Sequence, residues 1–143
     1  MANNKKKQIP NTTDTTFIQN WGLIQDSLDH LAQGISVFSP DLRLLLFNRN
    51  FIRMLDFPPE LIRVGTEISE LFRFNAERGE YGPGDIEEKI SERLEKARAF
   101  SPHVFERARP DGTVLEIRGN PLDGGGFVTI YTDITERKNN ETN

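Results

Sequence analysis

Arg107 is the residue whose type and position most directly indicate binding chemistry in this sequence. It lies in a β-prone stretch, at an alternate position that we expect to face an apolar interior. An unpaired guanidinium there would be very unfavourable, so Arg107 needs a partner. One interpretation is an internal pair with a carboxylate such as Glu67 or Glu70, or escape of the side chain to the strand edge. The other is a ligand that bears a carboxylate or phosphate and is held by two parallel hydrogen bonds. Both interpretations remain open.

Other kinds of site chemistry find little support in the sequence. Cysteine is absent, which excludes disulfides, thiolate metal sites and cysteine nucleophiles. His30 and His103 are isolated, and neither belongs to a spacing typical of metal ligands. The run Gly124–Gly126 precedes a predicted strand and lacks a following Lys-Ser/Thr, so it is not a phosphate loop. No nucleophile is paired with a base and an orienting group. We therefore expect no metal site and no catalytic residues, and we expect that this chain is not an enzyme.

Three strands near the C-terminus are expected to position Arg107. Asp111-Gly112 lies between two β-prone stretches, and it favours a tight hairpin turn because both residues tolerate positive φ. A third strand follows the glycines at 124–126. It ends at Asp133-Ile134-Thr135, where Asp133 is expected to terminate the strand and Thr135 to cap a charged helix. This part of the chain is therefore predicted to be an antiparallel unit with a helical exit.

Five apolar residues form a narrow stripe near the N-terminus: Phe17, Trp21, Ile24, Leu28 and Leu31. Their spacings of 4, 3, 4 and 3 residues predict an amphipathic helix within residues 14–33. This helix either lies on the sheet of its own domain or also pairs with its copy in a second subunit, and the two interpretations remain open. In the second case the five residues form a dimer interface. Residues 1–13 are polar and are predicted to be a disordered leader.

Two short strands, at 34–39 and 42–47, and several small helices occupy the middle of the chain. Asn48, Thr66 and Asp85 are placed to cap three of these helices. The order of elements predicts an α+β domain with one five-stranded antiparallel sheet and short helices on one face. Val128 and Ile130 make the other face apolar, and the N-terminal helix is predicted to cover it.

Three short motifs in this arrangement resemble those of PAS domains. They are Asn48-x-x-Phe51 at a helix start, Arg109-Pro110-Asp111-Gly112 at a turn, and Asp133-Ile134-Thr135 at the exit. The resemblance covers about residues 28–138. The runs RGEYGPGD and NPLDGGGFVTIYTDITERK are similar to the PAS subtype at the front of bacterial sensor histidine kinases and cyclic-di-GMP signalling proteins. The resemblance implies a PAS core at residues 34–135, followed at residues 136–143 by the start of a signalling linker.

The resemblance implies a ligand pocket between the concave face of the sheet and the middle helices. Strand alternation within that fold assigns a mostly apolar lining: Val37, Phe51, Met54, Leu55, Phe72, Leu94, Phe105, Arg107, Leu115, Ile117, Thr129 and Tyr131. The resemblance also implies that Asp133, Ile134 and Thr135 transmit the signal out of the domain. It points to no particular cofactor. Photoactive flavin-binding relatives need a cysteine, and the helix at 85–99, which carries the ligand in haem-binding relatives, has no histidine.

Length and charge set the remaining bounds. The 143 residues fit one domain, and 18 basic residues interspersed with 22 acidic ones argue against a nucleic-acid surface. No apolar run is long enough to span a membrane, and a cytoplasmic protein is expected. Together with the resemblance, this implies a homodimeric sensory module of a bacterial signal-transduction protein. Its foremost role is the input domain of a sensor histidine kinase, which passes ligand binding or conformational change to a C-terminal effector. The alternatives are a ligand-free interaction module, or the input domain of a diguanylate cyclase or phosphodiesterase.

Overall fold

A computed structural model describes the backbone of residues 15–142 and the side chains of residues 19–141. The predicted leader at 1–13 lies outside the described residues. The elements, in chain order, are α1 (Thr15–Asp29), β1 (Gly34–Phe38), β2 (Leu44–Phe47), α2 (Arg49–Leu55), α3 (Ile68–Glu77), α4 (Ile86–Arg98), β3 (His103–Ala108), β4 (Val114–Pro121), β5 (Phe127–Asp133) and α5 (Thr135–Thr142). In this part of the chain no helix has the length and apolar character needed to cross a bilayer.

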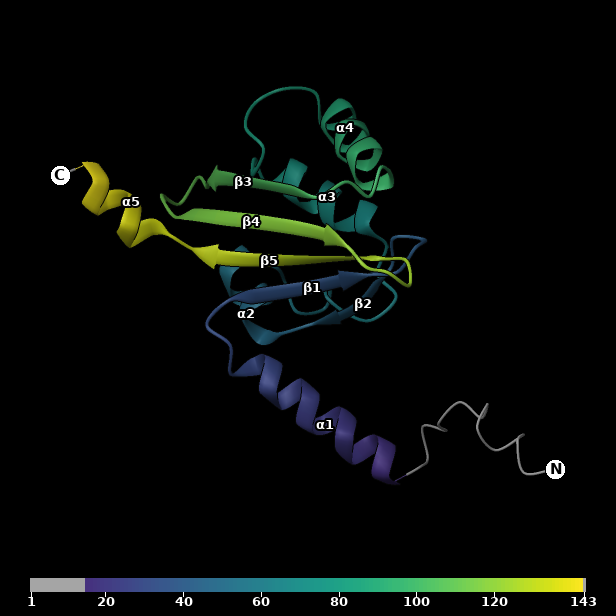
Figure 1. Ribbon diagram of the computed structural model, residues 1–143. Coiled ribbons are helices and arrows are strands. Elements are labelled where there is room, and N and C mark those ends of the chain that lie inside the picture. The colour runs from purple at the N-terminus through teal and green to yellow at the C-terminus, as the bar shows by residue number, and fades with distance from the viewer. Residues whose placement is uncertain (1–14, 143) are drawn as a thin grey trace.

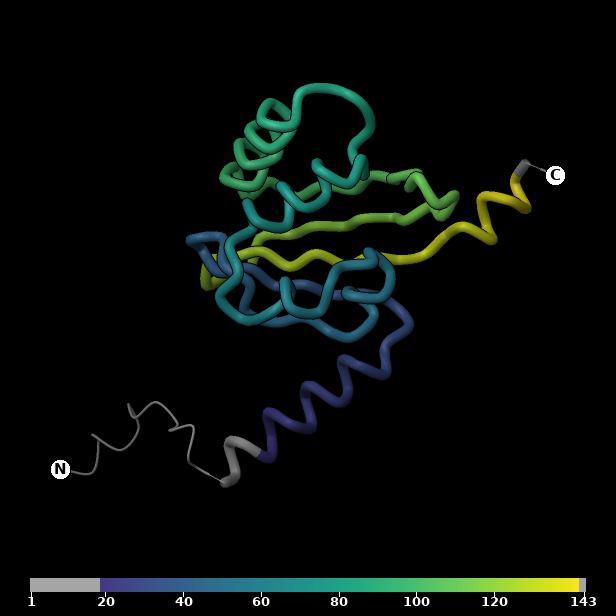
Figure 2. Tube along the Cα trace, turned by 180° about the vertical axis from the view of Figure 1, so that it is seen from behind, coloured from purple at the N-terminus to yellow at the C-terminus, as the bar shows by residue number. Residues whose placement is uncertain are grey.

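The five strands form one antiparallel sheet in the order β2-β1-β5-β4-β3. Helices α2 and α3 lie on one side of it, and α4 packs against α3 near the β3 edge (Figures 1 and 2). The predicted α+β fold is therefore confirmed. Because β1 pairs with β5 at the centre, the strand that follows α1 lies beside the strand that leads into α5.

The core lies between the sheet and the middle helices. Leu115 and Ile117 of β4 point into it, as the alternation predicted, and both are at most 3% exposed. They pack with Phe51 and Leu55 of α2 and Leu71 of α3. Burial of these large side chains, each worth about 1.5–3 kcal/mol, holds the helices on this face.

Asn48 caps α2 as predicted and also ties three segments together. Its Oδ1 accepts hydrogen bonds from the backbone N–H groups of Phe51 and Ile35, both at 3.0 Å. Its Nδ2 donates to the carbonyls of Leu28 and Gln33. Every hydrogen-bonding group of this 1%-exposed amide is engaged. The end of α1, the start of β1 and the start of α2 are consequently fixed to one side chain.

The caps of the next two helices agree with prediction in one case and differ in the other. Asp85 accepts from the N–H of Glu88, and so it caps α4. Helix α3 begins after Glu67 instead of Thr66, and Glu67 forms a capping box with Glu70. The Thr66 hydroxyl donates to the carbonyl of Leu61 and so lies outside the cap of the helix.

The position of α1 differs from the prediction that it covers the second face of the sheet. Figures 1 and 2 show it running away from the sheet beside β2 and α2. Gln25 donates to the carbonyl of Phe47, and Asp29 accepts from the backbone N–H of Arg49, so polar bonds fix the helix to this edge. The described helices leave the second face, with Val128 and Ile130, uncovered.

Candidate functional site

Most residues of the predicted pocket lie between the sheet and the helices. Those that are buried are Phe51, Leu55, Leu115, Ile117 and Thr129, and those that are half-buried are Met54, Phe72, Leu94, Arg107 and Tyr131. Five of these residues belong to the core or pack against it: Phe51, Leu55, Leu115, Ile117 and Tyr131. Val37 and Phe105 do not fit the prediction.

Val37 lies on the opposite face of the sheet, where it pairs with Val128 and Leu46. The fully buried Ser36 occupies the inward position instead. The cause is Gly34, because a Cβ at this position would come within 3.0 Å of the Phe51 backbone. Close approach of α2 makes Gly34 the inward residue, and alternation then turns Ser36 and Phe38 inward and Val37 outward.

Phe105 does point to the helical side, but its side chain is 44% exposed. It belongs to β3, which is the outermost strand and so has a neighbouring strand on one side only. Its ring lies 5.6 Å from the ring of His103. The prediction that Phe105 lines an enclosed interior is therefore wrong.

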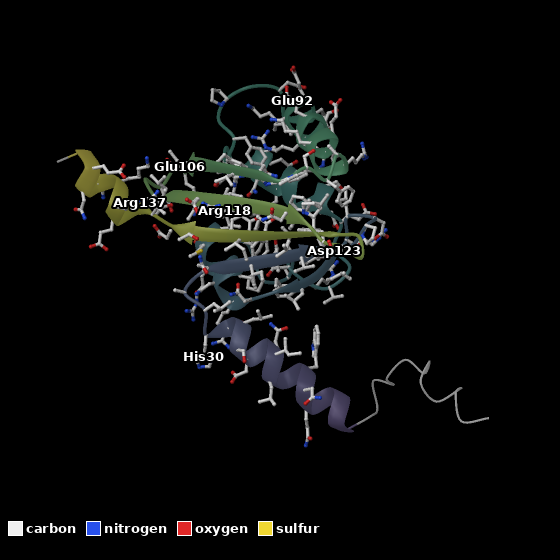
Figure 3. All side chains as sticks on the ribbon, in the orientation of Figure 1. His30, Glu92, Glu106, Arg118, Asp123 and Arg137 are labelled. Carbon is white, nitrogen blue, oxygen red and sulfur yellow. The ribbon has the colours of Figure 1, made fainter. Side chains whose placement is uncertain are left out.

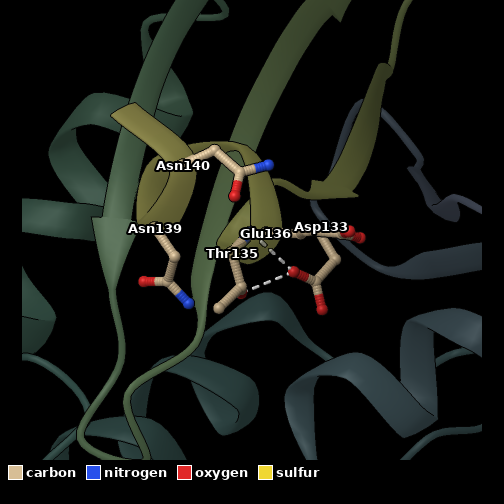
Figure 4. A pocket seen from close by; sticks show the side chains of 5 residues that line it. All are labelled: Asp133, Thr135, Glu136, Asn139 and Asn140. Atoms are coloured by element: carbon tan, nitrogen blue, oxygen red, sulfur yellow. Dashed lines mark hydrogen bonds between the residues drawn. The ribbon is translucent and has the colours of Figure 1, made fainter. Parts of the chain in front are cut away.

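The predicted ligand space is filled by side chains in this conformation. The ring of Phe51 lies 5.4 Å from those of both Phe57 and Tyr131. A hollow of about 350 Å³ lies outside this space, between α1 and β2, and includes Trp21, Leu45 and other residues of that edge. A second hollow, of about 580 Å³, lies at the start of α5 (Figure 4). Neither hollow is lined by a residue of the predicted pocket.

Tyr131 is a half-buried titratable group on the inner face of the sheet. Burial raises the pKa of its phenol, so the neutral form is favoured. The nearby Ser36 hydroxyl is fully buried and has no hydrogen bond of normal length and geometry within the described structure. The interior therefore holds polar groups from β1 and β5 next to the aromatic cluster.

Arg107 is 81% buried, and its acidic neighbour is neither Glu67 nor Glu70. One of its guanidinium nitrogens lies 3.9 Å from Oε2 of Glu80, whose side chain is only 2% exposed. Glu67 instead pairs with Arg43 at 2.8 Å. The internal carboxylate predicted for Arg107 therefore exists, but it comes from the loop between α3 and α4.

Arg109 is the main partner of Glu80, and sequence reasoning missed this pair. The two side chains form two hydrogen bonds, of 2.7 and 3.3 Å, in a bidentate arrangement. Arg109 also donates to the carbonyls of Met54 and Leu55 at the end of α2. Burial alone would lower the pKa of Arg109, but the hydrogen bond and the charge of Glu80 outweigh it and raise that pKa. The sequence did show Arg109 in a turn motif and Glu80 in a glycine-rich run. It held no pattern that would have paired these two residues.

Two further arginines enclose the same loop. The side chain of Arg78 lies 3.6 Å from Glu80, and its guanidinium stacks 4.7 Å from the ring of Phe74. The guanidinium of Arg93 lies 3.4 Å from the ring centre of Tyr81. Burial lowers the pKa of both arginines. The Glu80 carboxylate is thus surrounded by the guanidinium groups of Arg78, Arg107 and Arg109, whereas Arg93 of α4 contacts its neighbour Tyr81.

The predicted transmission residues form a compact junction at the end of β5. Oδ1 of Asp133 accepts hydrogen bonds from the backbone N–H and the hydroxyl of Thr135, at 2.9 and 2.6 Å (Figure 4). The Thr135 hydroxyl oxygen accepts from the N–H of Val114 on β4 at 2.9 Å. Ile134 is 6% exposed, and its N–H donates to the carbonyl of Val114. Thr135 therefore joins α5 to the sheet, and Asp133, instead of Thr135, caps the helix.

Helix α5 is also held by charges on β3. Lys138 lies 2.9 Å from Glu106, and Arg137 lies 3.6 Å from the same carboxylate. Figure 3 shows Glu106 and Arg137 at the same end of the molecule. The hydrogen bond to Glu106 raises the pKa of Lys138. The exit helix consequently contacts the strand that carries Arg107 and leads into Arg109.

The predicted dimer residues lie on a largely exposed helix. Trp21 and Ile24 are 45% and 49% exposed, whereas Leu28 is half-buried. Leu31 is exposed but lies beyond the end of α1, since the helix stops at Asp29. Phe17 belongs to α1, but its side chain is outside the described ones. The stripe is therefore mostly available for contact with another surface.

Comparison with known proteins identifies relatives of this arrangement. A family model described as "PAS fold" matches residues 28–142. The solved PAS domain of BvgS from Bordetella pertussis shares 18% identity and a TM-score of 0.57, over 85% of this chain and 90% of that one. The PAS domain of an HTR-like protein from Haloarcula marismortui shares 20% identity and a TM-score of 0.49, over 82% and 99%. A domain of a sensory box sensor histidine kinase/response regulator from Geobacter sulfurreducens shares 16% identity and a TM-score of 0.49, over 86% and 100%. No curated protein matches the chain.

Proposed function

This chain belongs to the PAS-fold family, and we propose that it is the sensory and dimerisation module of a bacterial signal-transduction protein. Its foremost role in this proposal is the input domain of a sensor histidine kinase in a two-component system. The module supplies no catalytic group of its own. It acts on a C-terminal effector, and a cytoplasmic location follows from the effector's need for ATP.

The observation that carries the proposal is the junction between the sheet and α5. Thr135 and Ile134 both bond to Val114, so a shift of β4 relative to β5 changes the position of α5 directly. The ion pairs of Lys138 and Arg137 with Glu106 extend the same coupling to β3. A rearrangement of the sheet would therefore reach the exit helix through short, specific contacts.

The proposed dimer uses α1. Trp21, Leu23 and Ile24 expose large apolar side chains, and such a cluster favours contact with a second apolar surface. The uncovered face of the sheet offers half-buried Ile35, Val37 and Val128 to the same contact. In this proposal α1 of one subunit packs against the partner, which corresponds to the second of the two interpretations of the helix.

A ligand-free interaction module is the second candidate function. It is favoured by the filled interior, where Phe51, Phe57 and Tyr131 occupy the space that a ligand would need. The same module could equally precede a diguanylate cyclase or phosphodiesterase, because the contacts of Thr135 involve only residues of this domain and do not depend on the type of effector.

The test uses the purified chain and its fusion to a histidine kinase core. Sedimentation velocity over a range of concentrations measures dimerisation, and native mass spectrometry detects a retained small molecule. A fusion of residues 15–142 to a histidine kinase core should show kinase activity that depends on the intact junction. A strictly monomeric chain whose fusion responds to no change at α1 or Thr135 would contradict the proposal.

A further inference from the structure

Glu80 lies in a cage of three arginines. Arg109 holds both of its oxygens, and Arg78 and Arg107 approach them to 3.6 and 3.9 Å. The side chain of Glu80 is 2% exposed, and those of the three arginines are between 5% and 22% exposed. A carboxylate enclosed by guanidinium groups from β3 and from the residues that follow α3 and β3 has the surroundings of a bound anion.

The charge around this cage depends on Glu80. The other carboxylates near Arg109 are Asp56 and Asp111, which are 65% and 47% exposed and lie 3.2 and 3.4 Å from its Nη1. Arg107 and Arg78 pair with no other side-chain carboxylate within 4.0 Å in the part of the chain that the structure describes. Removal of Glu80 would leave these two guanidinium groups partly buried without a counter-charge, which is strongly unfavourable.

The segment that carries Glu80 can change conformation more easily than a regular helix or strand. Gly79, Gly82 and Gly84 have φ values of 82°, 83° and 137°, where residues with a Cβ are disfavoured. No heavy atom lies within 4 Å of the Cβ positions of Gly79 and Gly82, so neither is packed against the core. Besides the Glu80 carboxylate, the segment is held by Tyr81 under Arg93, by the bond from Lys89 to the Tyr81 carbonyl, and by two bonds to Asn75, whose carbonyl accepts from the Glu80 N–H and whose side chain donates to the Tyr81 hydroxyl.

Exchange of one carboxylate for another has a small electrostatic cost. If an external anion takes the place of Glu80, the arginines keep a counter-charge and Glu80 becomes hydrated. The external anion must compete with a tethered group, whose effective concentration is on the order of millimolar. Anions with more than one acidic group are therefore favoured, because they can engage Arg107 and Arg109 together.

We propose that the cage of Arg78, Arg107 and Arg109 is a binding site for a small carboxylate or phosphate anion, and that Glu80 is a tethered occupant which the anion displaces. The inference rests on the proposed sensory function and names the class of its signal. Displacement would release the loop at 79–84 and, with it, Tyr81 from Arg93 and Arg107. Since β3 also carries Glu106, the change would lie on the strand that contacts α5.

The first experiment empties the cage. Glu80→Ala leaves room for an anion, whereas Glu80→Gln keeps the volume and removes the charge. Glu77→Ala, an exposed residue of α3, is the matched control. We expect acetate and, in a separate arm, inorganic phosphate to raise the melting temperature of Glu80→Ala by about 4 °C over chloride at equal ionic strength, if either anion reaches roughly ten times its Kd. Glu80→Gln and Glu77→Ala should show no such difference.

If Glu80→Ala does not fold in chloride, its refolding yield in acetate and in phosphate becomes the measurement. Folding restored by either anion supports the cage and shows which source of negative charge it accepts. A variant that fails to fold in every anion, or a thermal response equal to that of Glu77→Ala, overturns the inference.

The wild-type chain provides the second experiment. Titration with phosphate and with citrate, followed by the backbone amide resonances of Glu80, Tyr81 and Gly82, should give saturable shifts confined to this loop. Shifts no larger than those caused by chloride overturn displacement of Glu80 in the native protein. Neither experiment depends on an effector or on dimerisation, so failure here would leave the proposed signalling role standing, whereas failure of the kinase fusion would leave anion binding intact but remove its role as a signal.

Discussion

Replacement of Thr135 by valine tests the junction between the sheet and the exit helix most directly. Valine keeps the shape of threonine but loses the hydroxyl that donates to Asp133 and accepts from the N–H of Val114. The half-buried N–H of Val114 would lose its partner, and the usual cost of such a loss is about 1–2 kcal/mol. For a chain of this size the melting temperature should fall by roughly 3–8 °C. The sheet and α2 should remain folded because the core does not contact this hydroxyl.

A matched control lies in the hairpin turn between β3 and β4. Asp111 accepts from the N–H and hydroxyl of Thr113 at 2.9 and 2.6 Å, the same distances as in the Asp133–Thr135 pair. Thr113→Val should therefore lose a similar bond to its aspartate without affecting α5. Comparison of the two variants separates the cost of a broken turn from the cost of a broken exit.

The assays are thermal unfolding and amide hydrogen exchange of the isolated chain, and autophosphorylation of a kinase fusion. Thr135→Val should speed exchange of the Val114 and Lys138 amides by about tenfold, which corresponds to 1.4 kcal/mol, and should alter kinase output. Asp133→Ala should have a smaller effect on output because the bond to Val114 survives, at a cost of about 1 kcal/mol for the lost cap. Equal output from Thr135→Val and Thr113→Val would refute the assignment of Thr135 as the link to the sheet.

Three other predictions concern separate parts of the chain. Trp21→Glu places a charge in the exposed stripe of α1 and should shift sedimentation towards monomer with an unchanged circular dichroism spectrum; a variant that stays dimeric would remove α1 from the interface. Arg107→Met should cost no more than about 1–2 kcal/mol in urea denaturation, since Glu80 keeps Arg109, and a loss as large as that of Arg109→Met would show that Arg107 carries the pair. The hydrogen bonds from Thr113 hold the pKa of Asp111 below its usual value. The contribution of the ionised Asp111 carboxylate to the free energy of unfolding is therefore complete above the unfolded pKa of about 4. It is lost as pH falls through the lower folded pKa. Wild type should consequently lose more stability than Asp111→Asn between about pH 4 and 2, and parallel pH profiles would contradict this.

The arrangement of strands was predictable because local rules determine it. Asp111-Gly112 indicated the hairpin, and alternation placed Leu115 and Ile117 inward. Asn48 was recognisable as a cap from its position before an apolar helix. Each of these features depends on residues close together in the chain, where propensity and periodicity act.

Features that depend on distant contacts were not predictable. The stripe on α1 indicated an apolar face but not the surface it meets, and Asn48 and Asp29 fix that helix at the β2–α2 edge. The close approach of Phe51 to Gly34 determines which residues of β1 face inward. The apolar character of Val37 had instead suggested that this residue faces inward. The sequence predicted that Arg107 has a carboxylate partner but not which one, because the loop after α3 brings Glu80 to it.

The central pairing of β1 with β5 has a mechanical consequence. Gly34 opposite Tyr131 places the start of one strand beside the end of the other, and Gln33 also donates to the Thr132 hydroxyl at this end. Opposed forces on α1 and α5 would therefore load the hydrogen bonds between these strands one after another, as in opening a zipper, instead of shearing them all together. The fold should yield to tension at low force, first at the Gln33–Thr132 bond and then along the middle of the sheet. A domain connected in this way can open at its centre while each half of the sheet remains paired.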